Sequence, residues 1–437
     1  MTETTALLTD RYELTMVDAS LRDGTGERRC VFEVFTRHLA NGRRYGVLAG
    51  TGRLLQAIRD FRFGDAELAW LATEGVVSPA TLDWLADYRF RGTIHGYPEG
   101  EAFFPGSPVL VVEAGFAEGV LLETIALSVL NHDSAVATAA SRMVGAAQGR
   151  PVTEMGSRRA EEHAAVAAAR AAFIAGFAAS SNLEAGRLWG IPTMGTAAHA
   201  FTLVHDSERD AFRSQLDALG AGTTLLVDTY DIESGIRNAV ELAGTGLGSI
   251  RIDSGDLRVV VSEARRLLDE LGARATRIIV TNDLDEHAVA ALAATPVDSY
   301  GVGTSVVTGS GTPTMGMVYK LVARQEEDGT WLPVAKTSSG KASIGGRKNV
   351  TRRLAGGRAV AEIVHLGEAA SAVDVPGDED RPVLVPLVVD GTIDERWLGP
   401  GGVLLARERH AATMQELPLR ALQLSAGDPV LPTVFEG

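Results

Sequence analysis

Residues 249–282 have the sequence SIRIDSGDLRVVVSEARRLLDELGARATRIIVTN, and they decide the fold because they predict a strand, a helix and a second strand. The two apolar segments, SIRI and RIIV, are short and nearly continuous, as is typical of strands buried on both faces of a parallel sheet. Between them, apolar residues recur at helical spacing, and Gly272 follows as a helix-terminating glycine. The stretch is therefore a βαβ unit.

The same unit recurs through the middle of the chain. Helical patterns lie between the repeats, among them 231–244, with Asp231 as N-cap and Gly244 as C-cap. This regular return predicts an α/β fold and favours an irregular TIM-like barrel over an open sheet. In such barrels the chemistry occurs at the carboxyl ends of the strands. The other predicted strand segments are VTEMGS (152–157), IPTMGTAAHAF (191–201), TTLLVDTYD (223–231) and SYGVGTSVVT (299–308).

The two ends of the chain lack this alternation. Residues 93–116 alternate with Gly and Pro turns, as a small β-layer does, and after about residue 325 Gly, Pro and charged residues increase. We predict an N-terminal α+β lobe over 1–115, the barrel over 116–325, and a segment over 326–437 that forms a further lobe or returns to the first. From Ala164 to Ala179 the sequence predicts a buried Ala-rich helix.

Composition excludes several functional classes. The 437 residues suggest roughly two to three domains, and a net charge of −15 disfavours binding to nucleic acid or anionic lipid. Cys30 is the only cysteine, so neither an internal disulfide nor a cysteine zinc site is expected. The N-terminus lacks the pattern of a secretory signal, and 164–179 falls short of the ~20 apolar residues of a membrane span. We expect a cytoplasmic protein without membrane or nucleic-acid partners.

The segment GVGTSVVTG (301–309) places glycines where backbone can approach a ligand, and it contains a hydroxyl donor, Thr304. A late βα-loop with a helix N-terminus behind it commonly binds phosphate through backbone N–H groups, so Gly303 and Thr304 are candidate phosphate ligands. The alternative is a tight glycine turn. No Walker loop occurs in the chain, and Val306 occupies the position of the last glycine in G-x-G-x-x-G.

The strand-end sequence RIDSGD (251–256) brings charges of both signs together. Asp253 and Asp256 could accept hydrogen bonds from ribose hydroxyls or help to hold Mg²⁺, and the Arg251 guanidinium suits a carboxylate or phosphate. The alternative is that Asp253 or Ser254 caps the helix that begins near Asp256. Both interpretations are compatible.

Other candidate residues follow neighbouring strands. GSRR (156–159) could supply positive charge for a pyrophosphate or a pyridine carboxylate, or be solvated surface arginine. His199, three residues after Thr196, could act as general base or as a nucleophile toward ATP, although most of the nine histidines are expected to be structural. Tyr12, in a helix capped by Thr9 or Asp10, is either a core tyrosine or a ring that stacks on a pyridine.

An ordered set of motifs resembles the nicotinate phosphoribosyltransferase family over nearly the whole length of the chain. The motifs are, in chain order, TDRYELTM, GSRRA, GTAAHAF, RIDSGDL, VTNDLDE, YGVGTSVVT, YKLV and KTSSGKASIGGRKNVTRR. The resemblance implies an irregular α/β barrel related to the type II phosphoribosyltransferases, with a lobe built from both ends of the chain. It also implies a homodimer with active sites at the interface, nicotinate and phosphoribosyl pyrophosphate as substrates, Mg²⁺ as cofactor and ATP as co-substrate.

The resemblance also assigns residues. It implies that Tyr12, Thr196 and Arg251 contact nicotinate, that Gly303 and Thr304 hold the 5′-phosphate, and that ATP phosphorylates His199. It places Arg158, Asp253 and Asp283 around the ribose and pyrophosphate, with Asp253 as a catalytic residue and no metal ligands assigned. The family usually has Pro-Gly where this chain has Gly345 and Gly346, which leaves the rigidity of that loop open, while Lys341 and Lys348 remain available to phosphates.

Two alternatives remain beside this function. One is a sister phosphoribosyltransferase that acts on nicotinamide or quinolinate. Quinolinate would require more basic residues around the ring, and nicotinamide an acceptor for its amide. The other is a non-catalytic nucleotide-binding sensor, against which the joint presence of Arg251, Asp253, His199 and Thr304 argues.

Overall fold

The computed structural model describes residues 4–336, 343–370 and 380–437. The chain divides into two compact units. Unit 1 combines Met1–Thr138 with Thr312–Gly437, so it contains both ends of the chain, and unit 2 is Ala139–Gly311. The long helix α6, Glu123–Ala146, contributes to both.

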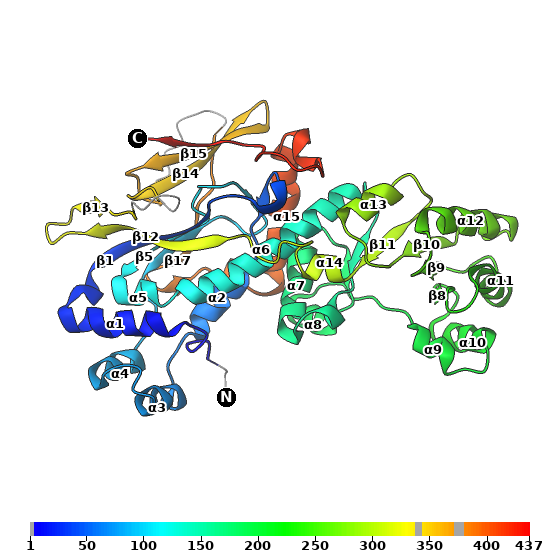
Figure 1. The fold of residues 1–437 in the computed structure, drawn as a ribbon, viewed down its shortest axis with the longest axis horizontal. Coiled ribbons are helices and arrows are strands. Elements are labelled where there is room, and N and C mark those ends of the chain that lie inside the picture. Colours follow the sequence, from blue (N-terminus) through cyan, green and yellow to red (C-terminus); the bar gives the residue numbers. More distant parts are fainter. Residues whose placement is uncertain (1–3, 337–342, 371–379) are drawn as a thin grey trace. The chain divides into compact units, whose positions relative to one another are not determined.

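Unit 1 is built on two main sheets (Figure 1). The larger has seven antiparallel strands in the order β13-β12-β1-β5-β3-β17-β18, with β1 between β12 and β5. In the smaller, of order β16-β14-β15-β19, only β15 and β19 run parallel. The strands, including the β2-β4 ribbon, are β1 Arg29–Thr36, β2 Gly46–Val47, β3 Thr93–Gly96, β4 Ala102–Phe103, β5 Leu110–Gly115, β12 Met317–Gln325, β13 Trp331–Pro333, β14 Lys348–Ala355, β15 Arg358–Leu366, β16 Arg381–Pro382, β17 Val385–Val389, β18 Thr392–Ile393 and β19 Thr433–Glu436.

The predicted β-layer over 93–116 is confirmed, since it contains β3, β4 and β5. One apolar core, which includes Phe32, Phe61 and Phe103, connects the larger sheet with the helices of unit 1. These helices are α1 Arg11–Asp23, α2 Thr51–Asp60, α3 Asp65–Thr73, α4 Pro79–Ala86, α5 Phe116–Val120 and α15 Gly399–Glu416.

A fully buried arginine, Arg352 on β14, connects the smaller sheet of unit 1 with the β2-β4 ribbon. Its guanidinium donates to Glu362 of β15 at 2.9 and 3.2 Å, to Glu101 at 2.5 Å and to the carbonyl of Ala102 on β4 at 2.7 Å. Arg381 reaches the second oxygen of Glu101 at 2.9 Å. These cations hold the pKa of Glu101 near 2, well below its ordinary value, although burial opposes them.

His410 on α15 lies beside this cluster and gives unit 1 a pH-dependent stability. Burial, with Arg407 acting in the same direction, lowers its pKa to about 4. In the unfolded chain His410 is protonated below about pH 6.5, whereas in the folded chain it stays neutral down to about pH 4. Protonation therefore favours the unfolded chain, and the free energy of unfolding falls as the pH drops through this window. We expect a loss of about 3 kcal/mol from this residue alone. Denaturant titrations at pH 7 and pH 4 should show a smaller loss for His410→Gln, and the exposed control His287→Gln should behave as wild type. Equal losses in all three proteins would contradict the assignment.

Unit 2 is a parallel sheet of six strands in the order β7-β6-β11-β10-β9-β8 (Figure 1). The predicted strands at 152, 224, 249, 277 and 299 are confirmed. The unit's strands are β6 Val152–Glu154, β7 Ala179–Ser180, β8 Thr224–Leu226, β9 Ser249–Ile252, β10 Arg277–Val280 and β11 Ser299–Val302. Its helices are α7 Glu162–Ile174, α8 Leu183–Trp189, α9 His199–Leu203, α10 Glu208–Leu219, α11 Ile232–Ala243, α12 Leu257–Glu270, α13 Glu286–Leu292 and α14 Thr304–Val307.

The barrel prediction is confirmed only in part. The strands follow the cyclic order of a barrel, because β6 lies between β7, which follows it in sequence, and β11, the last strand. The segment 191–201, predicted as a strand, forms a single bridge between Thr193 and Ser180 in the described structure, and α9 begins at His199. No described backbone pairing joins this segment to β8. The sheet is therefore curled but open on that side.

The predicted helix ends of unit 2 were confirmed in some places and wrong in others. Asp231 and Gly244 do cap α11, and the Asp231 side chain accepts from the backbone of Ser234. The predicted caps Asp253 and Ser254 of α12 are wrong, because Asp256 caps it by accepting from the backbone of Arg258. The Ala-rich helix α7 is buried as predicted but ends at Ile174, since Gly176 takes φ +108° before β7 begins at Ala179.

One described helical stretch, Phe116–Ala146, is long and apolar enough to cross a membrane by length and composition, yet 67% of its most apolar window is buried inside the molecule. That burial is typical of a core helix, as expected for the helix pattern that begins at Leu121.

Candidate functional site

The predicted residues of unit 2 follow the carboxyl ends of adjacent parallel strands. Arg158 follows β6, Asp253 follows β9, Asp283 follows β10, and Gly303 and Thr304 follow β11. Because parallel strands end at one edge of a sheet, the fold gathers these turns there, which we call the strand-end site. Its residues are Met155–Arg159, Met194–His199, Val227–Asp228, Arg251–Ser254, Thr281–Asp283 and Val302–Thr304.

Arg251 reaches across the open side of the sheet to Thr196. Its Nη1 donates to the Thr196 hydroxyl at 3.2 Å, while its Nε is buried and has no hydrogen-bond partner among the described residues. Burial lowers the pKa of Arg251, Arg158 acts in the same direction, and Asp253 and Asp228 oppose them. A buried donor without a partner is rare in folded proteins and suits a bound anion.

His199 is held by a carboxylate that the sequence interpretation missed. Its Nε2 lies 3.1 Å from Oδ1 of Asp228, whose side chain is fully buried, whereas the His199 side chain is 40% exposed. The other oxygen of Asp228 accepts from the backbone N–H of Asp253 at 2.8 Å and from the Ser254 hydroxyl at 2.7 Å. Asp228 therefore fixes both the imidazole and the turn after β9, and leaves Nδ1 of His199 as the nitrogen that faces away from it.

The turns after β9 and β10 are joined through Asp253. Its Oδ1 accepts from the hydroxyl of Thr281, which immediately follows β10. The next two residues have left-handed backbones, with φ 116° at Asn282 and φ 27° at Asp283, and both are exposed. Left-handed backbone at non-glycine residues costs free energy and concentrates at functional sites. The structure thus presents Asp253 and Asp283 from neighbouring strand ends.

The turns after β6 and β11 pack against each other without room for side chains. A Cβ on Gly156 would lie 2.2 Å from Cγ1 of Val307 and 3.0 Å from the carbonyl oxygen of Gly303, so only glycine fits. The backbone N–H of Met155 donates to the carbonyl of Val302 at 2.7 Å. Thr304 begins α14, a single turn, so a helix N-terminus follows this loop as expected.

Tyr12, the residue of unit 1 predicted to contact nicotinate, lies in the first turn of α1. Its side chain is 44% exposed, which excludes an ordinary core position. Partial burial and the nearby Glu123, Glu13 and Asp10 carboxylates raise its pKa to about 12, so the phenol stays protonated at neutral pH. Asp10 is the N-cap residue of α1 but makes no side-chain capping bond, while the Thr9 hydroxyl donates to Glu13.

The sequence and fold are similar to those of known proteins. Residues 7–131 match the family model for the nicotinate phosphoribosyltransferase (NAPRTase) N-terminal domain. The chain is 55% identical over 436 residues to nicotinate phosphoribosyltransferase pncB1 of Mycobacterium tuberculosis, covering 98% of this chain and 94% of the relative. It is 38% identical to nicotinate phosphoribosyltransferase of Bacillus subtilis, covering 79% and 73%. The crystal structure of human nicotinic acid phosphoribosyltransferase superposes with a TM-score of 0.83 at 26% identity, covering 98% and 97%.

The chain belongs to the nicotinate phosphoribosyltransferase family. The resemblance inferred from the ordered motifs is therefore confirmed. Family membership also accounts for the position of those motifs, since most of them fall at the strand ends of unit 2.

One expectation that came with the family motifs is wrong. Lys348 is not available to a phosphate, because it is buried at the start of β14 and its ammonium donates to both oxygens of Glu33, at 2.9 and 3.0 Å. Glu33 is buried as well and supplies the counter-charge, since burial of an unpaired ammonium would be prohibitive. Lys341 lies outside the described residues.

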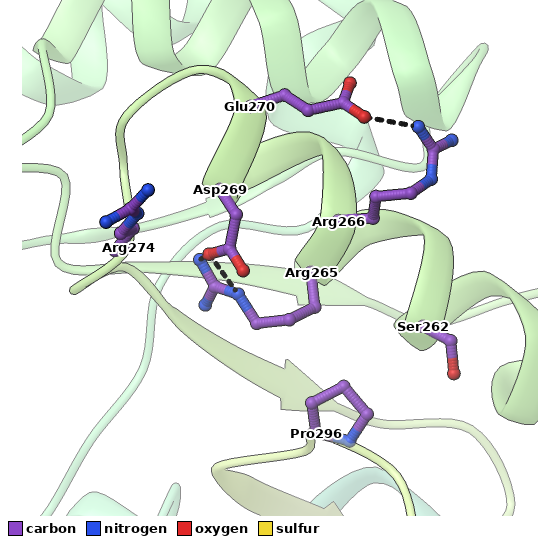
Figure 2. Close-up of a pocket in the computed structure, with 7 residues that line it drawn as sticks. All are labelled: Ser262, Arg265, Arg266, Asp269, Glu270, Arg274 and Pro296. Atoms are coloured by element: carbon purple, nitrogen blue, oxygen red, sulfur yellow. Dashed lines mark hydrogen bonds and ion pairs between the residues drawn. The ribbon is translucent and has the colours of Figure 1, made fainter.

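A hollow of about 580 Å³ in unit 2 does not coincide with the strand-end site (Figure 2). It is lined by the second half of α12 and by residues that precede β10 and β11, and so lies toward the amino ends of the strands. Figure 2 shows that four of its charged side chains form ion pairs with each other, Arg265 with Asp269 and Arg266 with Glu270. We therefore place the chemistry at the strand-end site.

Proposed function

We propose that this protein is a nicotinate phosphoribosyltransferase, which forms nicotinate mononucleotide and pyrophosphate from nicotinate and phosphoribosyl pyrophosphate, the first step of NAD synthesis from nicotinate. The observation that carries the proposal is Arg251, whose buried Nε lacks a protein partner while Nη1 is held by Thr196. A guanidinium fixed in this way offers a planar fork to the carboxylate of nicotinate.

The reaction breaks the bond between ribose C1 and pyrophosphate and forms one to the pyridine nitrogen. Positive charge develops on the sugar, so positioning and electrostatics supply the catalysis. In this proposal Asp253 stabilises the charged sugar, Arg158 binds pyrophosphate, Asp283 lines the ribose region, and Gly303 with Thr304 holds the 5′-phosphate. Tyr12 contacts the pyridine ring, as its exposed position in the first turn of α1 permits.

Mg²⁺ is proposed as the cofactor. It commonly binds through one or two carboxylates together with substrate phosphates, rather than in an all-protein cage. Asp253 and Asp283 fit that pattern, because they come from adjacent strand ends and Oδ2 of Asp253 has no hydrogen-bond donor among the described residues. When bound, the ion would neutralise charge on the departing pyrophosphate.

We also propose that ATP phosphorylates His199 and that hydrolysis of the phosphohistidine drives synthesis forward. Its support is the orientation of His199, whose Nε2 is held by the buried Asp228 while the ring remains partly exposed. Such coupling can change affinity or equilibrium tenfold for each ~1.4 kcal/mol.

The first experiment measures mononucleotide formation from phosphoribosyl pyrophosphate and Mg²⁺ with nicotinate, nicotinamide or quinolinate, with and without ATP. We expect turnover with nicotinate only, enhanced by ATP. Preferred turnover of either other pyridine would replace the proposed substrate. Calorimetric binding of the mononucleotide without any turnover would favour the non-catalytic sensor.

The His199→Ala variant should keep ATP-independent turnover and lose ATP stimulation. Asp228→Asn should weaken the stimulation as well, because the amide cannot accept from Asp253, Ser254 and His199 in the way the carboxylate does. A phosphate-transfer assay with labelled ATP should give acid-labile label on the wild type but not on His199→Ala, with His287→Ala as the matched control. Full ATP stimulation of His199→Ala would remove the coupling role.

A cytoplasmic homodimer with active sites at the interface remains part of the proposal. The dimer is supported by large apolar side chains that are exposed on or beside the strand-end segments of unit 2, namely Leu183, Met194, Leu203, Val204 and Tyr230. Sedimentation of the purified protein would test the dimer.

A further inference from the structure

Glu154, the last residue of β6, is a buried carboxylate that no proposed catalytic step uses. Glu154 is fully buried, and β6 lies between β7 and β11 in the unit 2 sheet. No described cation forms an ion pair with it, and burial raises its pKa above the ordinary value although two neutral donors oppose the shift. Burying a carboxylate without a cation is costly, so its presence calls for a specific reason.

The two oxygens of Glu154 hold two different turns. Oε1 accepts from the backbone N–H of Gly156, in the turn that leads to Arg158, and Oε2 accepts from the hydroxyl of Ser180 at 2.6 Å, at the end of β7. Ser180 in turn accepts from the backbone N–H of Asn182 at 2.9 Å, and the Asn182 amide donates to Ser157 at 3.1 Å. The hydrogen bonds thus lead from Glu154 through β7 and back to the same turn.

This turn is also constrained from the β11 side. Gly156 packs against Val307 and Gly303 too closely for any side chain, and Met155 bonds to Val302. Once Glu154 holds the N–H of Gly156, the short helix Ser157–Arg159 begins from a fixed point. Arg158 is exposed there and close enough to Arg251 for its charge to affect that guanidinium.

We propose that Glu154 is a positioning residue whose carboxylate holds the 155–159 turn and thereby places Arg158 for the pyrophosphate of the substrate. The inference rests on the proposed function, because it takes Arg158 as the pyrophosphate ligand. A carboxylate suits the task because each of its two oxygens accepts a hydrogen bond, one from Gly156 and one from Ser180.

Glu154→Gln is the test variant because it preserves size and removes one acceptor. An amide has one acceptor oxygen, so its NH₂ must face either the Ser180 hydroxyl, whose proton then loses its acceptor, or the Gly156 N–H, where two donors oppose each other. Loss of a charge-assisted bond in this place should weaken pyrophosphate binding and raise KM for phosphoribosyl pyrophosphate by about tenfold to a hundredfold, with KM for nicotinate unchanged. Val152→Ala, on the same strand, is the control that lowers Tm without touching these hydrogen bonds.

A double-mutant cycle separates positioning from general damage. Calorimetry with pyrophosphate and Mg²⁺, together with the kinetics, is carried out on wild type, Glu154→Gln, Arg158→Ala and the double variant. If Glu154 acts through Arg158, the double variant should bind pyrophosphate no more weakly than the single variant that has the lower pyrophosphate affinity. The inference would be overturned if the losses of pyrophosphate affinity in the two single variants multiply in the double variant. It would also be overturned if Glu154→Gln keeps the wild-type KM and pyrophosphate affinity. In both cases turnover of nicotinate by the wild type would still uphold the proposed function. A wild type without that turnover would overturn the proposed function itself.

Discussion

The Arg251→Ala variant is expected to lose about 10²–10³-fold in kcat/KM for nicotinate while its Tm stays close to that of the wild type. Truncating one partner of a desolvated, hydrogen-bonded charge pair typically costs 2–5 kcal/mol, and the proposed pair is Arg251 with the nicotinate carboxylate. Stability should change little, because burial disfavours the charged guanidinium and its Nε has no described protein partner to lose. Steady-state kinetics over a range of nicotinate concentrations provide the measurement.

Two comparisons make the result specific. Arg266→Ala removes an exposed arginine of α12 that forms an ion pair with Glu270, and it should leave the kinetics unchanged. Nicotinamide carries no carboxylate, so the ratio of nicotinate to nicotinamide turnover should fall in Arg251→Ala. If turnover of both pyridines falls equally, Arg251 does not recognise the carboxylate, and the buried Nε of Arg251 no longer supports nicotinate as the substrate.

The parallel sheet of unit 2 was predictable from sequence because its strands are short apolar runs that end in polar residues. The signal failed where a strand is too short to show it. β7 consists of Ala179 and Ser180, and its alanine continues the composition of α7, so the sequence predicted one longer helix. Barrel closure also failed, because ladder formation by 191–201 depends on tertiary contacts, and only Thr193 pairs. The hairpin of β14 and β15 lies in a region whose periodicity is weak.

The candidate site was predictable for exposed polar residues at strand ends, and less so for buried ones. Asp228 stands in TTLLVDTYD, a segment assigned only as a strand, and nothing in its local sequence shows that its carboxylate contacts His199 and the turn after β9. Glu154 is hidden in the same way inside VTEMGS. Lys348 shows the converse: the family resemblance left it available to phosphates, whereas its burial against Glu33 is a property of the assembled unit 1. The roles of such residues depend on contacts with partners that are distant in the sequence.

The largest effect on stability is expected from Arg352→Met, which should destabilise unit 1 by about 3–5 kcal/mol. The substitution fills a similar volume but leaves Glu101 and Glu362 buried, and removal of one partner from a buried ion pair is strongly destabilising for that reason. Denaturant unfolding should show the loss at pH 7. The loss should shrink at low pH, because without Arg352 only Arg381 and Arg409 still lower the pKa of Glu101, and its protonated form is cheaper to bury.

The adjacent residue provides the matched control for this prediction. Arg353 follows on the same strand, but its side chain is 41% exposed and its ion pairs with Asp380 and Glu436 lie at 3.4 and 3.5 Å. Surface pairs of this kind contribute about 0–1 kcal/mol, so Arg353→Met should unfold nearly as the wild type does. Comparable losses in both variants would mean that the β14–β15 hairpin tolerates no substitution at this point. A loss confined to Arg352→Met would mean that Glu362 and Glu101 need this guanidinium, although Arg381 and Arg409 also contact Glu101, and that unit 1 requires it to join the smaller sheet to the β2-β4 ribbon.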